Sequence, residues 1–258
     1  MPAKTVSILV LVSLLLPTAA HARELTVAAA SDLAFALPEI VSAFEKKTGH
    51  TVRVSYGSSG NFYSQLSQGA PFDLFFSADA DYPRRLEAAG FVRPGSRAPY
   101  AVGRIVLWVP NGSPIDAERD GLRALLHPFV KRVAIANPRH APYGKAAVAA
   151  LRHSGIYEAI EKKLVFGENM AQAAQFVQSG SAQAGLVALS VASAPAMRRA
   201  GRYWEVPQEK YPKLMQEAVI LRWSRQPELA AYFLAHLRSA ESQAVLRGFG
   251  FLSPEDTR

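Results

Sequence analysis

The sequence of 258 residues contains no cysteine. This absence excludes disulfide bonds, thiolate metal sites, a cysteine nucleophile and lipidation of an N-terminal cysteine. No apolar run is long enough to span a bilayer, and the one at the N-terminus covers only Val6–Leu16. Lys4 precedes this run and Ala20-His21-Ala22 follows it, which is the pattern of a secretory signal peptide with its cleavage site. We therefore predict a signal peptide over residues 1–22 and a mature chain that is free in the periplasm of a Gram-negative cell and not inserted in the membrane.

The sequence also lacks any block of five or six charges of one sign. The net charge of +8 comes from scattered basic pairs such as Lys46-Lys47 and Arg198-Arg199. Such pairs indicate a solvated surface, and we predict no nucleic-acid partner. There is no P-loop, no dinucleotide fingerprint and no pair of histidines at metal-ligand spacing. We therefore expect no cofactor and no metal ion held directly by side chains.

The stretch Thr26–Leu33 predicts a buried strand that turns directly into a helix. Small and β-branched residues run up to Ala30, and apolar residues at helical spacing begin at Leu33. Ser31 and Asp32 stand at the turn, where the first N–H groups of the helix lack internal partners and the helix dipole is positive. Such a turn can hold an anion, with the Ser31 hydroxyl as a further donor. Equally, serine and aspartate are preferred N-caps of helices that bind nothing.

Similar polar turns recur along the chain. Further segments typical of strands end in Gly57–Gly60, Ser77–Asp79, Asn137–Gly144, Gly167–Asn169 and Ser190. Alternation of strands with helices predicts parallel sheets covered by helices on both faces, in which ligands bind beyond the carboxyl ends of the strands. We also predict that Gly49 ends the first helix, that Asn169 caps a later one, and that Leu229–Leu246 forms one final helix.

The motifs, taken in order, resemble those of the periplasmic molybdate-binding proteins of ABC importers. The segments that carry the resemblance are Ala28–Leu33, Tyr56–Gly60, Phe72–Asp79, Asn137–Gly144 and Ala184–Ser190. The likeness covers essentially the whole mature chain. It implies the type II periplasmic binding protein fold, an α/β protein of two lobes, each a mainly parallel sheet flanked by helices, with two crossings between the lobes. On this resemblance, lobe one comprises residues 23–101 plus 217–258, and lobe two comprises residues 102–216.

The resemblance also implies where a ligand binds. In the family, serine hydroxyls and backbone N–H groups from the strand-to-helix turns hold an oxyanion in the cleft between the lobes. Matching motif to motif places these donors at Ser31 and Ser59 in lobe one. In lobe two it places them at Tyr143 and at the backbone N–H of Met170. Some family members carry a further tyrosine where this sequence has Ala188, and Tyr143 is the candidate to supply that hydroxyl.

Two more residues are secondary candidates for the site, Ser58 and Asp32. No lysine or arginine occupies the matched positions, so neutral donors would hold the anion, and molybdenum would be bound only as its oxyanion. Such donors suit molybdate, tungstate and sulfate, which are fully ionised at neutral pH, whereas phosphate keeps a proton and needs an acceptor. If Asp32 faced the cleft, its carboxylate would repel a dianion or accept the phosphate proton. We expect Asp32 instead to cap N–H groups and to face away from the cleft.

The sequence therefore predicts a periplasmic binding protein, not an enzyme, that captures molybdate or tungstate and delivers it to an inner-membrane ABC permease with its ATPase. A freely diffusing monomer is expected. The alternatives are a carrier for sulfate or phosphate, a periplasmic oxyanion sensor subunit and, more distantly, an exported serine hydrolase. Gly57–Gly60 is not the Gly-x-Ser-x-Gly elbow of hydrolases, and the mature chain's histidines are dispersed in sequence.

Overall fold

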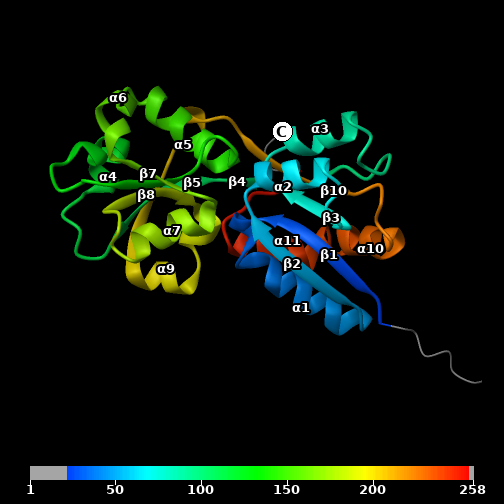
Figure 1. The fold of residues 1–258 in the computed structure, drawn as a ribbon. Coiled ribbons are helices and arrows are strands. Elements are labelled where there is room, and N and C mark those ends of the chain that lie inside the picture. The colour runs from blue at the N-terminus through cyan, green and yellow to red at the C-terminus, as the bar shows by residue number, and fades with distance from the viewer. Residues whose placement is uncertain (1–21, 256–258) are drawn as a thin grey trace, which may run out of the picture.

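The computed structural model describes residues 22–255, in which two five-stranded sheets form two lobes side by side (Figure 1). We call the first sheet with its helices lobe one and the second lobe two. The predicted signal peptide falls outside the described residues except for Ala22. Within the described chain, no helix is both long and apolar enough to cross a membrane.

Lobe one is built on the sheet order β2-β1-β3-β10-β4. The strands are β1 (Glu24–Ala30), β2 (Thr51–Gly57), β3 (Leu74–Ser77), β4 (Ala98–Gly103) and β10 (Leu214–Ile220). Alternate side chains of β1 face opposite sides of the sheet: Leu25 and Val27 pack with one set of helices, and Ala28 packs with the other. The first set is α1 (Ala36–Thr48), α10 (Pro227–Leu237) and α11 (Ala240–Gly248), and the second is α2 (Ser59–Ser67) and α3 (Asp81–Ala88) (Figure 1).

Lobe two repeats the plan with the sheet order β7-β6-β8-β5-β9. Its strands are β5 (Ile105–Pro110), β6 (Val133–Ala136), β7 (Leu164–Gly167), β8 (Ala184–Ala188) and β9 (Gly201–Glu205). Its helices are α4 (Ala117–Asp120), α5 (Pro142–His153), α6 (Tyr157–Ile160), α7 (Met170–Gln178), α8 (Leu189–Ala192) and α9 (Pro195–Ala200), with 3-10 turns at Gly121–Leu126, Glu161–Lys163 and Gln208–Lys210. One continuous core, centred on the fully buried Trp108, holds the lobe together.

The predicted two-lobed α/β fold is confirmed, but the sheets are mixed and not mainly parallel. In each sheet, two strand pairings are parallel and two are antiparallel. The chain leaves lobe one along β4 and returns along β10, and these neighbouring strands therefore run in opposite directions. The predicted lobe bounds, at 101/102 and 216/217, fall inside β4 and β10. The residue-level division into lobes stays a prediction.

Local predictions can be checked at three helix ends. Gly49 ends α1 with φ +69°, a left-handed conformation that glycine adopts without steric cost. Asn169 caps α7, since its side-chain oxygen accepts the Gln172 N–H at 3.1 Å. The single helix predicted over Leu229–Leu246 is wrong. The chain forms α10 and then α11, because the Ser239 side chain accepts the Ser242 N–H and begins a new helix.

Candidate functional site

The polar turns of the two lobes meet in one small cavity at the lobe junction. We call it the junction cavity; it is lined by Ala30, Ser31, Asp32, Gly57, Ser58, Ser59, Ala78, Ala141, Pro142, Tyr143 and Met170. Its volume is about 10 Å³ for the centre of a water-sized sphere, which is room for one water molecule. All six candidate residues therefore lie in one place, and the four primary ones are only 1–3 % exposed. Their role as ligands stays a prediction.

Three helices begin at the wall of this cavity: α2 from lobe one, and α5 and α7 from lobe two. The first N–H groups of each helix have no intrahelical acceptor, and each helix dipole places partial positive charge there. No side chain caps the start of α5, where Pro142 occupies the first turn beside Tyr143. The three helix starts thus add partial positive charge to the junction cavity, whose lining has no lysine or arginine and one carboxyl group, that of Asp32.

Ser31 reaches from lobe one to the first turn of α7 in lobe two. Its hydroxyl oxygen accepts the N–H groups of Met170 at 3.0 Å and Ala171 at 3.3 Å. It does not cap its own helix, because the turn Ser31–Leu33 has no side-chain cap. The capping interpretation of this serine is therefore wrong. The hydroxyl oxygen is already an acceptor, so the hydroxyl hydrogen remains as a donor.

Ser58 and Ser59, in the turn between β2 and α2, make different structural hydrogen bonds. Ser58 is the N-cap of α2 and accepts the Asn61 N–H at 3.3 Å. Ser59 is the first residue of α2, and its Oγ accepts the Ala78 N–H at 3.0 Å. That contact fixes the Ser59 hydroxyl beside the end of β3. As with Ser31, the hydroxyl hydrogen of Ser59 has no protein acceptor within residues 22–255.

The expectation that Asp32 caps a helix and faces away is wrong. Its Oδ2 accepts a hydrogen bond from Gln216 Nε2 at 2.6 Å, and its carboxylate also interacts with the Tyr143 hydroxyl. Its Oδ1 is buried and has no hydrogen-bond partner. Burial raises the pKa of Asp32 from 3.8 to about 6, and the hydrogen bonds from Gln216 and Tyr143 lower it only in part.

Tyr143 also lies where the two lobes join. Its hydroxyl is 3.1 Å from Gln216 Nε2, and a Cβ added to Gly103 would collide with it. Only glycine at the end of β4 therefore leaves room for this hydroxyl. Burial and the charge of Asp32 hold the pKa of Tyr143 well above its usual value, so that the phenol stays protonated and can donate.

Sequence reasoning did not find Gln216 and Tyr100. Gln216 is fully buried on β10, and its Oε1 accepts from the Tyr100 hydroxyl at 2.7 Å. The Tyr100 hydroxyl oxygen also lies 3.1 Å from the Ser77 carbonyl oxygen. These contacts hold the amide of Gln216 in the orientation that donates to Asp32. The signal that could have found the network is the pair Gln216-Glu217 inside a strand whose other residues are apolar.

A second polar contact between the lobes lies beside the junction cavity. His140 Nδ1 is 2.9 Å from Ser58 Oγ, and the His140 carbonyl accepts the Gly60 N–H at 2.8 Å. Glu168 Oε1 accepts from Asn61 Nδ2 at 2.5 Å and lies 3.6 Å from His140 Nε2. We call Ser58, Gly60, Asn61, His140 and Glu168 the inter-lobe clasp. Of these five residues, the sequence analysis named only Ser58 as a candidate for the site.

Comparisons with known proteins identify the family of this chain. The profile of one family, the bacterial extracellular solute-binding proteins, matches residues 25–252. The chain belongs to this family. It is 40% identical to the molybdate-binding protein ModA of Azotobacter vinelandii over 237 residues, 92% of this chain and 93% of that protein. It is 38% identical to ModA of Rhodobacter capsulatus over 240 residues, 93% of this chain and 92% of that protein.

A solved structure of the Azotobacter vinelandii periplasmic molybdate-binding protein superposes with a TM-score of 0.84. The match covers 89% of this chain and 99% of that one, at 33% sequence identity. The resemblance to molybdate-binding proteins of ABC importers is therefore confirmed.

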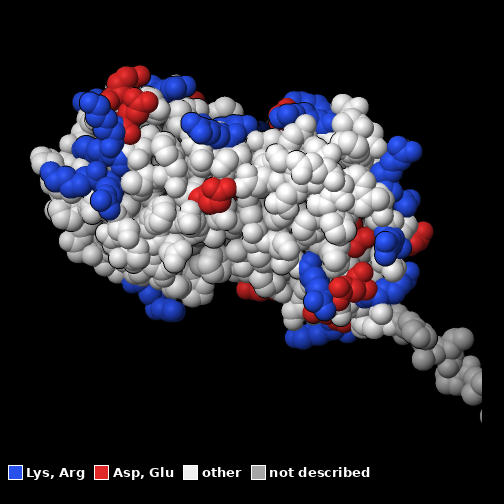
Figure 2. Space-filling model, viewed as in Figure 1, with Lys and Arg blue, Asp and Glu red and all other residues white. Residues whose placement is uncertain are grey.

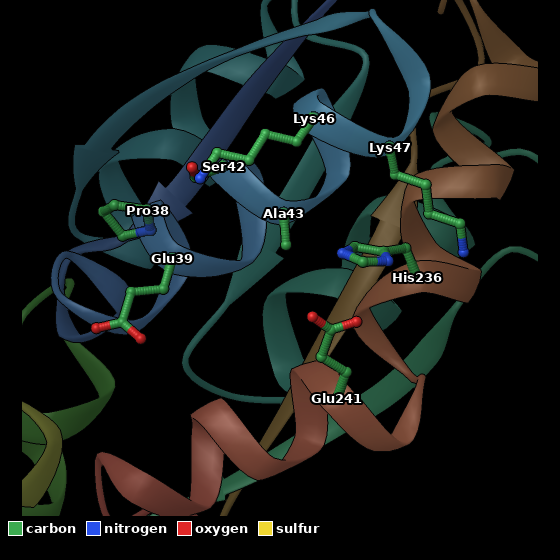
Figure 3. Close-up of a pocket in the computed structure, with 8 residues that line it drawn as sticks. All are labelled: Pro38, Glu39, Ser42, Ala43, Lys46, Lys47, His236 and Glu241. Atoms are coloured by element: carbon green, nitrogen blue, oxygen red, sulfur yellow. The ribbon is translucent and has the colours of Figure 1, made fainter.

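This solute-binding protein also has a larger hollow, on the outside of lobe one. We call it the lobe-one groove; it measures about 780 Å³ and is lined by Pro38, Glu39, Ser42, Ala43, Lys46, Lys47, His236 and Glu241 (Figure 3). Its charged residues have both signs, and the lysines and glutamates are exposed. His236, its buried member, packs on Phe44 and contacts the Ile40 carbonyl at 3.3 Å. Size alone therefore does not identify the functional site.

Proposed function

We propose that this chain is a periplasmic binding protein that captures molybdate or tungstate in the junction cavity and delivers it to an inner-membrane ABC permease with its ATPase. One observation carries the proposal: Ser31, Ser59, Tyr143 and Met170, from turns on both lobes, line the same buried cavity. The relatives named above are molybdate-binding proteins, and the match to this chain covers almost their whole length. A ligand that contacts both lobes at once favours the closed state, which a permease can then recognise.

The donor set suits a fully ionised oxyanion. Two serine hydroxyls whose hydrogens have no protein acceptor within residues 22–255, and the partial positive charge of three helix N-termini, favour an anion without a positively charged side chain. The Met170 N–H and the protonated Tyr143 hydroxyl now interact with Ser31 and Asp32, and we infer that both turn to the anion when it binds. A buried dianion is stable only when it is hydrogen-bonded on all sides, which such a cavity provides. The cavity must expand to accept it, since it now has room for one water molecule. We infer that size then separates molybdate and tungstate, with their longer metal–oxygen bonds, from sulfate.

The protein is proposed to act by binding and not by catalysis, with no cofactor, as a monomer. The inter-lobe clasp contains a serine, a histidine and a glutamate, the residue types of a hydrolase triad. However, Ser58 accepts the Asn61 N–H as a helix cap, and Glu168 accepts from Asn61 and lies 3.6 Å from the His140 ring. The contacts of Asn61 with Glu168 and of Ser58 with His140 join the two lobes, and we infer that they stabilise closure. On the face shown in Figure 2, basic side chains lie in separate groups, the largest at the left end beside acidic side chains, and we propose no nucleic-acid partner.

Thermal unfolding with four oxyanions tests the proposal. A ligand that binds only the folded protein stabilises it by about 2.7 kcal/mol at a concentration of 100 Kd. We expect molybdate and tungstate to raise the unfolding midpoint of the mature protein, and sulfate and phosphate to leave it almost unchanged. A shift with sulfate alone or phosphate alone would replace the proposed ligand. No shift with any of the four would contradict the proposal.

A further inference from the structure

The lining of the junction cavity contains one ionisable carboxyl group, that of Asp32, and no positively charged side chain. The carboxyl is 1% exposed. Its two oxygens differ: Oδ2 receives a hydrogen bond from Gln216, whereas the buried Oδ1 has no partner. A carboxylate oxygen left in this way is costly when ionised, and it becomes a hydrogen-bond donor when it is protonated. This asymmetry is not explained by the packing of the lobes.

Because this inference concerns the ligand, it rests on the proposed function. We propose that Asp32 binds one proton when a fully ionised oxyanion enters the junction cavity, so that the protonated Oδ1 donates a hydrogen bond to the anion. The anion itself brings no proton. Binding of each molybdate or tungstate is then coupled to uptake of one proton from the solvent. An ionised Asp32 would instead place a third negative charge beside the dianion, without a cation in the lining to offset it.

The groups that surround Asp32 do not take up the proton near pH 7, so we assign it to Asp32. Helices α7 and α8, which pack on its turn, contain no titratable side chain. Burial raises the pKa of Tyr56 on β2 to about 12, and burial with nearby carboxylates holds the pKa values of Tyr100 and Tyr143 well above the usual value. These phenols therefore stay neutral near pH 7. Asp79, after β3, is the other carboxyl near this network, and its charge acts on Tyr100.

Geometry separates Asp79 from this role. Its Oδ1 is 3.0 Å from the Ser77 hydroxyl and 3.2 Å from the Tyr82 N–H, and it does not line the junction cavity. Asp32 in the free protein has a pKa of about 6, so it is mostly ionised at pH 7.5, and a neighbouring dianion shifts the equilibrium toward the protonated form. A proton must then be taken up during binding.

Isothermal titration of molybdate tests the inference. At pH 7.5, titrations in two buffers of different ionisation enthalpy should give an uptake approaching one proton per molybdate. Between pH 6.5 and 8.5 the Kd should rise by up to tenfold per pH unit, because deprotonation of Asp32 competes with binding. The variant Asp32→Asn keeps the shape and supplies a fixed Nδ2 donor. In this variant the proton uptake should fall to zero and the Kd should vary less than twofold over the same range.

The matched control is Asp79→Asn, which changes a partly buried carboxyl outside the cavity and should keep the wild-type pH profile. Molybdate binding by the wild type that is independent of pH, with no proton uptake, would overturn this inference and leave the proposed function intact. An Asp79→Asn variant that loses the pH dependence would also overturn it, because the proton would then reside elsewhere. Absence of molybdate binding at every pH would overturn the proposed function and the inference together.

Discussion

The junction cavity and the lobe-one groove differ in the properties that decide whether an oxyanion binds. The groove is larger by volume, about 780 Å³ against about 10 Å³, and it contains two lysines. The junction cavity contains no lysine or arginine, but the hydroxyls of Ser31 and Ser59 are buried there and fixed by hydrogen bonds, and three helices begin at its wall. In water, exposed charges are screened and mobile, whereas buried and oriented dipoles are not. Donor convergence, and not volume or formal charge, is therefore the reason for which we propose the junction cavity as the site.

The largest effect of a single substitution on affinity is expected inside the junction cavity. Ser59→Ala removes a hydroxyl donor and should weaken molybdate binding by about 1.5–3 kcal/mol, the range for a hydrogen bond to a charged group. Ser64→Ala is the matched control, because Ser64 is an exposed serine of the same helix. Isothermal titration of both variants measures the difference. Equal affinities for the two variants would remove Ser59 from the site.

A change of similar size is expected in the free energy of unfolding when Asp32 is replaced by asparagine. The folded-state pKa of Asp32 is about 6 and its ordinary value is 3.8, so the folded chain binds more protons between these values. The contribution of Asp32 to stability is therefore full below about pH 4 and is lost as the pH rises through about 6. At pH 7.5 the variant should be more stable than the wild type by about 2–3 kcal/mol, the free-energy equivalent of this shift.

Urea unfolding of both proteins at pH 4 and pH 7.5 measures that difference. The advantage of the variant should be small at pH 4 and appear as the pH rises. An advantage of the same size at both pH values would show that the amide packs better in its site, and would contradict the role given to the Asp32 charge.

A smaller effect is expected at the inter-lobe clasp. His140→Ala removes the ring that contacts Ser58 and keeps the carbonyl that accepts the Gly60 N–H. The closed state should become less stable relative to the open state by about 0.5–1.5 kcal/mol, the net contribution of one neutral hydrogen bond. The Kd for molybdate should rise accordingly. Small-angle scattering of the ligand-free variant should show a more open average shape. Arg139→Ala, an exposed neighbour in the same loop, should change neither quantity.

The smallest effect is expected in the lobe-one groove. Lys46→Ala removes an exposed charge that lies among residues of both signs (Figure 3). Stability should change by less than about 0.5 kcal/mol and the Kd for molybdate should not change, as for most surface substitutions. A loss of affinity in Lys46→Ala comparable with that in Ser59→Ala would indicate that molybdate binds in the lobe-one groove and would contradict the choice of the junction cavity.

The sequence predicts best what is decided locally. The turns at Ser31, at Ser58–Ser59 and at Asn169-Met170 are marked by short-range patterns, and parallel strands bring their carboxyl ends together whatever the details of packing. Resemblance to a known family supplied Tyr143, which no local pattern marks as a ligand. The fold class followed from the alternation of strands and helices, which the structure confirms.

The parts that the sequence did not predict depend on distant contacts. Asp32 is oriented by Gln216, 184 residues away, and not by the helix that follows it. His140 contacts Ser58 from the other lobe, across 82 residues of sequence. Strand β9 was not predicted because it is an edge strand, whose side chains show no alternation of buried and exposed positions. In each case the partner that decides the conformation is supplied by the tertiary structure.

The most direct test of the central claim is a crystal structure of the mature protein with tungstate, read from the anomalous scattering of tungsten. We predict one strong anomalous peak in the junction cavity. The oxygens of the bound tungstate should then lie within hydrogen-bond distance of Ser31, Ser59 and the Met170 N–H. A main peak in the lobe-one groove beside Lys46 and Lys47, with none between the lobes, would contradict the account.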